Sequence, residues 1–175
     1  MFIISKKIPF IFIIISMVFP KTNYIDYKQV ESNVTEQNII QNDFESNYGN
    51  DWQFEWNINN TPHRVFGHSI SHSFNALDED QSEISARSFI EENPSFFNIS
   101  NENLSLWVNE QHGKIRYLIF NQYYNNIPVW NGRIDFRYRL NGDLVMLGHD
   151  AFPKFNLDTT PVIGLDDAKL IAQLD

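Results

Sequence analysis

The chain reads KIRYLIFNQYYNNIPVWNGRIDFRYRLNGDLVMLGHD over residues 114–150, a stretch punctuated by two turn signals, Asn125-Asn126 and Asn141-Gly142. Between these signals, residues 133–140 alternate strictly between polar and apolar side chains. A period of two predicts a β-strand with one buried face and one face in water. Asn-Gly favours a type I′ turn, so residues 143–149 are predicted to fold back as a hairpin partner. We therefore predict an antiparallel meander, whose alternating strand buries Ile134, Phe136, Tyr138 and Leu140.

Further strands are predicted upstream of the meander. Residues 52–58 place Trp52, Phe54, Trp56 and Ile58 on one side, and Asn59-Asn60 offers a turn before residues 64–70. We expect these two segments to form a first hairpin. Residues 104–108 are predicted as another strand, with Leu104, Leu106 and Val108 on one face and Trp107 on the other, leading through His112-Gly113 into residues 115–124.

One helix is predicted over residues 80–93. Asp80 and Glu83 have the spacing of a capping box, an apolar stripe follows, and Pro94 discourages continuation. The stripe is expected to lie on the sheet, with the two phenylalanines after the helix in the core. The predicted fold class is α+β, an antiparallel meander sheet packed against one main helix. The stripe and the two core aromatics are Ala86, Phe89, Ile90, Phe96 and Phe97.

Composition excludes several classes of function. The chain has 175 residues, no cysteine, 42% apolar residues and a net charge of −9. Without cysteine there are no disulfides, no thiolate zinc sites and no thiol nucleophile, so stability must come from packing. An acidic surface repels phosphate backbones, which argues against nucleic-acid binding.

The N-terminus has the order of a secretory signal. Lys6 and Lys7 precede an apolar run over residues 8–19 that is shorter than a membrane span. We predict a signal peptide over residues 1–20 and a secreted protein that meets the membrane only through this signal; an uncleaved anchor stays open because no Ala-x-Ala site follows. Residues 21–50 are predicted to be a flexible lead-in, with at most a short helical turn around residues 35–41.

Catalytic motifs are absent from the sequence. None of the five histidines begins His-Glu-x-x-His, and no Gly-x-Ser-x-Gly or phosphate-binding loop occurs. His63, His68 and His72 are interpreted as solvent-facing residues of a strand, and Asp143 and Asp150 as solvated residues at hairpin ends. We predict no catalytic residue, no metal and no cofactor in these residues.

Several segments resemble the fungalysin/thermolysin propeptide (FTP) domain. They are Gly113–Tyr117, Gln122-Tyr123-Tyr124, Ile127–Gly132 and Asn141–Leu144, with upstream matches at residues 61–67 and 89–97. Asn126 stands where the family often has Gly, and Asn tolerates the positive φ required there. The resemblance covers residues 51–152 and implies a cystatin-like fold.

The end of the chain resembles a second family. After a predicted linker over residues 153–164, Pro161-Val162-Ile163 and Asp166-Asp167-Ala168 resemble the start of a PepSY domain. An amphipathic helix as short as residues 165–174 is marginal alone, so it either docks back on the sheet or belongs to a truncated domain over residues 165–175. We favour truncation.

The resemblance implies a pro-region of a secreted zinc metallopeptidase, acting as intramolecular chaperone and inhibitor. Its partner would be the peptidase catalytic domain, in cis or in trans. The candidate contacts also have a purely structural interpretation, in which most of them belong to the core. The arginines would then lie on a solvent-exposed sheet face, and Gln122 would be a buried polar group with its hydrogen bonds satisfied. The alternative function is a free-standing secreted module that binds a protein or peptide. The candidate contact residues are Gln122, Tyr124, Pro128, Trp130, Arg133, Arg137 and Arg139.

Overall fold

The computed structural model describes residues 34–72, 74–153 and 157–173. The predicted signal peptide, residues 1–20, lies outside the described residues. Six strands form an antiparallel sheet in the order β1-β2-β6-β5-β4-β3. The strands are β1 Trp52–Trp56, β2 Pro62–Ile70, β3 Leu104–His112, β4 Ile115–Tyr124, β5 Ile127–Arg139 and β6 Leu144–His149. The predicted α+β meander is confirmed, because β3 to β6 are neighbours in chain order and the β1–β2 hairpin extends the sheet beside β6.

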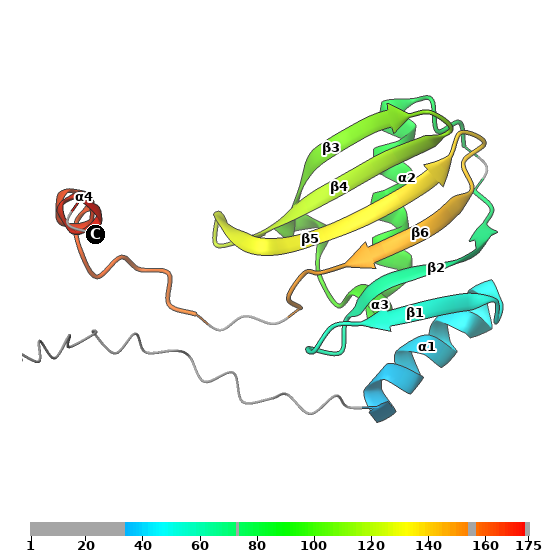
Figure 1. The fold of residues 1–175 in the computed structure, drawn as a ribbon, viewed down its shortest axis with the longest axis horizontal. Coiled ribbons are helices and arrows are strands. Elements are labelled where there is room, and N and C mark those ends of the chain that lie inside the picture. The colour runs from blue at the N-terminus through cyan, green and yellow to red at the C-terminus, as the bar shows by residue number, and fades with distance from the viewer. Residues whose placement is uncertain (1–33, 73, 154–156, 174–175) are drawn as a thin grey trace, which may run out of the picture.

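Helices cover one face of this sheet. They are α1 Val34–Tyr48, α2 Glu79–Glu92 and α3 Pro94–Phe97, and a 3₁₀ turn follows at Asn101–Asn103. Figure 1 shows α2 and α3 behind the sheet and α1 beside β1, with no helix in front of the strands. We call the uncovered face the outer face.

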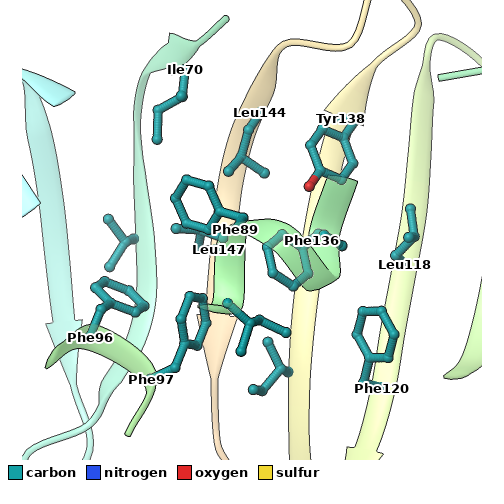
Figure 2. Close-up of a cluster of buried hydrophobic side chains, with 14 of the residues drawn as sticks. Ile70, Phe89, Phe96, Phe97, Leu118, Phe120, Phe136, Tyr138, Leu144 and Leu147 are labelled. Carbon is teal, nitrogen blue, oxygen red and sulfur yellow. The ribbon is translucent and has the colours of Figure 1, made fainter. Parts of the chain in front are cut away.

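The core lies between the helices and the sheet. Figure 2 shows Phe89 of α2 and Phe97 of α3 reaching the strands, where both rings lie about 6 Å from the ring of Phe136. Ile134, Phe136 and Tyr138 of β5 are fully buried. The alternating pattern of β5 thus sorts its residues as predicted, except that Leu140 lies in the turn after the strand.

The lead-in prediction is wrong for the residues of α1. Val34–Tyr48 forms a full helix, and Phe44 is buried against Trp52, Phe54 and Phe96. Phe44 is the single fully buried residue of the helix. Ile40 and Tyr48, one turn to either side, are half-buried against the same core. The stripe is only one residue wide in an otherwise polar segment, which is why the sequence reading missed the helix.

Helix α2 begins one residue earlier than predicted and uses a different cap. The N-cap is Asp78, whose carboxylate accepts a hydrogen bond from the Gln81 backbone N–H at 3.0 Å. The predicted pair Asp80 and Glu83 is therefore not the capping box. Burial of Ala86, Phe89 and Ile90 confirms the predicted stripe.

Both turn signals mark turns, but the turn at Asn141-Gly142 is not of the predicted type. At Asn125-Asn126 both residues have positive φ, at 49° and 64°, as a type I′ turn requires. At Asn141-Gly142 only Gly142 has positive φ, and its N–H donates to the Arg139 carbonyl. The second hairpin therefore uses a three-residue loop closed by a left-handed glycine, and the type I′ prediction there is wrong.

Strand β3 contains a bulge at Trp107. Leu106 pairs with Phe120, whereas Val108 pairs with Ile119, so Trp107 is an extra residue. The inserted residue reverses the alternation, and Val108 does not share the face of Leu104 and Leu106 as predicted. Ile58 also departs from its predicted face, because β1 ends at Trp56 and Ile58 is exposed in the turn.

The C-terminal helix α4 spans Leu165–Ala172, within the predicted range of residues 165–174. Its apolar residues Leu165, Leu170 and Ile171 are exposed. Across the described ranges, no helix has the length and apolar character needed to cross a lipid bilayer.

Candidate functional site

Two hollows adjoin each other at one end of the sheet, where the β1–β2 turn, the start of β5 and the end of β6 meet. Asn131 and Arg133 line both of them. We call the first the charged hollow and the second the aromatic hollow. The other residues of the charged hollow are Asn57, Ile58, Asn59, His63, Asp150 and Phe152. Those of the aromatic hollow are Trp107, Asn121, Pro128, Val129, Trp130 and Gly132.

Asp150 is the centre of the charged hollow. Its carboxylate lies 2.5 Å from Nδ1 of His63, 3.1 Å from the side-chain amide nitrogen of Asn57 and 3.2 Å from the guanidinium of Arg64. Burial alone would raise the pKa of the Asp150 carboxyl, but these partners outweigh burial and lower it. The Asp150 carboxylate is thus fixed by three polar side chains, and its interpretation as a solvated hairpin residue is wrong.

A row of three residues across β2, β6 and β5 supports this hollow. Gly148 pairs with Arg64 on one side and with Asp135 on the other. Because Gly148 has no side chain, the Arg64 guanidinium can cross it and reach the Asp135 carboxylate at 3.5 Å. A Cβ at Gly148 would lie 2.6 Å from Nη1 of Arg64, so a larger residue would displace this arginine.

Asp135 is buried on the outer face, with 3% of its side chain exposed. Its Oδ2 lies 3.5 Å from Arg64 and 3.6 Å from Nε of Arg133. Its Oδ1 has no hydrogen-bond partner among the residues that the structure describes. A buried carboxylate needs compensating charge, and the two flanking arginines supply it.

Arg133 is held from one side. Its Nε lies 3.6 Å from Asp135 and 3.5 Å from Asp150, and 42% of its side chain is exposed. Neither contact is a hydrogen bond, and the guanidinium makes no hydrogen bond within the described part of the chain. The two carboxylates therefore orient the guanidinium and leave its outer edge available to a ligand.

The aromatic hollow results from a large bulge in β5. Arg133 pairs with Asn121 and Pro128 pairs with Tyr123, so four residues of β5 oppose Gln122 alone. Asn131 takes a positive φ of 59° within this bulge. Trp130 is thereby turned outward, with 86% of its surface exposed, and Trp107 in the bulge of β3 is 62% exposed.

Gln122 lies beneath the bulge. It is 2% exposed, its amide donates to the Phe152 carbonyl at 2.7 Å, and its carbonyl accepts from the Phe152 N–H at 2.8 Å. Gly132 leaves room for it, since a Cβ there would lie 2.7 Å from the Gln122 side-chain oxygen. Gln122 is therefore a satisfied polar group that fixes the chain after β6, and it cannot contact a partner directly.

The structure brings together only part of the predicted contact set. Pro128, Trp130 and Arg133 lie in the aromatic hollow. The hydroxyl of Tyr124 donates to the Leu157 carbonyl at 3.4 Å, beside the β4–β5 turn. The remaining two arginines lie farther along the outer face. Arg137 stacks 4.3 Å from the ring centroid of Tyr117, and Arg139 lies 3.9 Å from Asp143 at the opposite end of β5.

The histidines differ from one another. His68 is exposed, as predicted, but His63 pairs with Asp150 and His72 packs among Phe74, Phe89 and Tyr138. Burial lowers the pKa of His72. No group of three or more His, Asp or Glu side chains with metal-binding geometry occurs among the residues described.

Sequence reasoning missed His63, Asp135, Asp150 and Trp107 as parts of one site. The available signal was Asp135, a single acid between arginines on the wet face of β5. Pairing it with Arg64 required the sheet order, because β2 lies far from β5 and β6 in the chain.

Comparisons with known proteins give little further information. No family model matches the sequence, and no curated protein matches it. Among solved structures, the Bacillus megaterium YpeB C-terminal domain aligns with a TM-score of 0.41 and 13% sequence identity. The alignment covers 62% of this chain and 47% of that one, so the chain spans about half the length of its structural neighbour. This degree of similarity carries no functional information.

Proposed function

We propose that the chain is the pro-region of a secreted zinc metallopeptidase, which helps the catalytic domain to fold and keeps it inactive. The observation that carries the proposal is the outer face, which none of the described helices covers. It presents two exposed tryptophans beside Arg133, whose side chain is 42% exposed. Exposed aromatic residues and arginine are the residue types that dominate the energy of protein interfaces. The resemblance to FTP domains supplies the identity of the partner.

A preformed sheet suits both activities. A catalytic domain rich in non-local contacts folds slowly, and a surface that binds its native-like form stabilises that form by mass action. The same binding, retained after folding, would cover the catalytic cleft until the pro-region is removed.

In this proposal the chain itself performs no chemistry. The sequence has no His-Glu-x-x-His, and the Asp150 carboxylate of the charged hollow is paired with His63 and Arg64. The peptidase catalytic domain, in cis or in trans, would provide the zinc site. Export would follow from the predicted signal peptide.

A trans assay tests the proposal. The full chain is added to a thermolysin-like peptidase, and both proteolytic activity and the yield of refolding from denaturant are measured. We expect inhibition and a higher refolding yield. Absence of both effects would contradict the proposal. Gly148→Arg is a useful companion variant, because it displaces Arg64 and should weaken both effects together.

The alternative is a free-standing secreted module that binds a protein or peptide through the same face. The exposed tryptophans and the oriented arginine fit this function equally well, because neither feature requires a peptidase. Reading the gene beyond residue 175 separates the two functions: a downstream His-Glu-x-x-His favours the pro-region, and a stop codon favours the module.

A further inference from the structure

The guanidinium of Arg133 has the arrangement of a carboxylate receptor. Asp135 and Asp150 both lie about 3.5 Å from its Nε, so both carboxylates attract the guanidinium from this side. The two terminal nitrogens form a rigid fork that binds a planar carboxylate through two parallel hydrogen bonds. Among the residues that the structure describes, the Arg133 guanidinium has no hydrogen-bond acceptor.

The local charge disfavours a ligand with two negative charges. Arg64 and Arg133 together balance Asp135 and Asp150, so the site has little excess positive charge to offer a dianionic phosphate. The chain as a whole carries a net charge of −9, which repels a strongly acidic partner. A single carboxylate in an otherwise neutral or apolar segment fits both conditions.

The aromatic hollow selects what stands beside that carboxylate. Trp107, Pro128 and Trp130 surround a space that begins at Arg133. An apolar side chain that covers such exposed indole rings binds favourably, because apolar surface is removed from water. An apolar residue adjacent in sequence to the acid would reach this space while the acid pairs with Arg133.

The path across the site indicates an internal segment of a chain. The aromatic hollow lies on one side of Arg133 and the charged hollow on the other, and Asn131 lines both. A segment can therefore enter over the tryptophans, pass Arg133 and leave over Ile58 and Asn59. A C-terminal carboxylate would end at Arg133 and leave half of this surface empty.

We propose that Arg133 and the aromatic hollow bind an extended internal peptide segment in which one acidic residue is flanked by apolar residues. This proposal rests on the function proposed above and specifies which segment of the partner the outer face recognises. It can fail separately: if the full chain inhibits a peptidase but does not bind such peptides, docking uses another part of the face.

Capped peptides test the proposal with the full chain. The probe is acetyl-Ala-Leu-Glu-Leu-Ala-amide, and its matched control has Gln in place of Glu. Binding is followed by NMR, through the indole N–H signals of Trp107 and Trp130. We expect the Glu peptide to bind about tenfold more tightly than the Gln peptide, as the loss of a charge-assisted bidentate pair predicts. Acetyl-Ala-Leu-Leu with a free carboxyl terminus should bind more weakly than the Glu peptide.

Variants assign the two parts of the site. Arg133→Gln should remove the preference for Glu over Gln, and Arg133→Lys, which keeps the charge but not the fork, should reduce it. Trp130→Ala should weaken both peptides by a similar factor without affecting folding, because the side chain is 86% exposed. Arg139→Gln, at the far end of β5, is the control and should change nothing.

Three results would overturn the proposal. They are equal binding of the Glu and Gln peptides, no signal change at peptide concentrations of about 10 mM, where even weak ligands of this size bind, and an Arg133→Gln variant that is folded and keeps the preference. Tighter binding of the free carboxyl terminus would replace the internal segment by a chain end.

Discussion

The two halves of β5 belong to one strand but differ in register and in the exposure of their apolar side chains. From Arg133 to Arg139 the strand is regular, and its inward residues Ile134, Phe136 and Tyr138 are completely buried. From Val129 to Gly132 the register breaks, and Trp130 becomes the most exposed aromatic residue of the described structure. Where alternation holds, apolar residues stabilise the fold; where a bulge interrupts it, they become available for binding.

The largest expected effect breaks the regular half. Phe136→Ala removes a buried ring that contacts Phe89, Phe97 and Phe120. We expect the free energy of unfolding to fall by about 3–5 kcal/mol, as for other buried phenylalanines. Trp130→Ala in the bulged half is the control, with a change within about 0.5 kcal/mol. Chemical denaturation measures both, and similar losses for the two variants would contradict the comparison.

The second prediction concerns pH. His149 pairs with Ile134 of the regular half, is fully buried and lies 2.9 Å from the Phe97 carbonyl. Burial lowers its pKa to about 4, from an ordinary value of 6.5, so the folded state disfavours the proton. Stability from this group is complete above about pH 6.5 and is lost as the pH falls toward 4, by about 3 kcal/mol in all.

His149→Gln isolates this effect, because an amide can still donate to the Phe97 carbonyl but does not titrate in this range. The difference in unfolding free energy between the native chain and the variant, measured from about pH 7 to about pH 4, should shrink by about 3 kcal/mol. A constant difference would show that His149 is not held neutral.

A third prediction tests what supports the bulged half. Gln122→Leu removes both hydrogen bonds to the Phe152 backbone at nearly constant volume. We expect a loss of about 2 kcal/mol in denaturation, the cost of leaving such groups without these bonds. Gln53→Leu on the exposed side of β1 is the control and should be nearly neutral. If both variants are neutral, Gln122 does not organise the bulge.

The smallest expected effect sharpens the comparison on the outer face. Arg137→Ala removes the stacking of the guanidinium on Tyr117, which is worth about 0.5–1 kcal/mol. Arg139→Ala, whose nearest acid lies 3.9 Å away, should cost less, within about 0.5 kcal/mol. A reversed order in thermal or chemical denaturation would mean that the cation–π contact contributes no stability.

Regular features of this fold could be predicted from the sequence. The alternation in β5 and the stripe of α2 are local periods, and the polar turn residues mark where strands end. The structure confirms the meander that these signals predict. Helix α1 was missed, because its core contacts, Ile40, Phe44 and Tyr48, form a narrow stripe in an otherwise polar segment.

The candidate site was predictable only in part. Trp130 and Arg133 were candidate contacts on the strength of the FTP resemblance, whereas the residue pattern alone favoured a core position for Trp130, which is 86% exposed. Trp107 is exposed because of a bulge that no local pattern indicates. The ion pairs of Arg64, Asp135 and Asp150 depend on β6 lying between β2 and β5. This strand order is set by packing over the whole sheet, which local periods do not encode.

The central claim is that the bulged end of the outer face docks a peptidase catalytic domain. The most direct measurement is the affinity of the full chain for a thermolysin-like catalytic domain, compared with that of a Trp130→Ala, Arg133→Lys double variant of unchanged fold. We predict measurable binding that falls at least about a hundredfold in the variant, the loss of two interface hot spots. Equal affinity of the two chains, or no binding by either, would contradict the account.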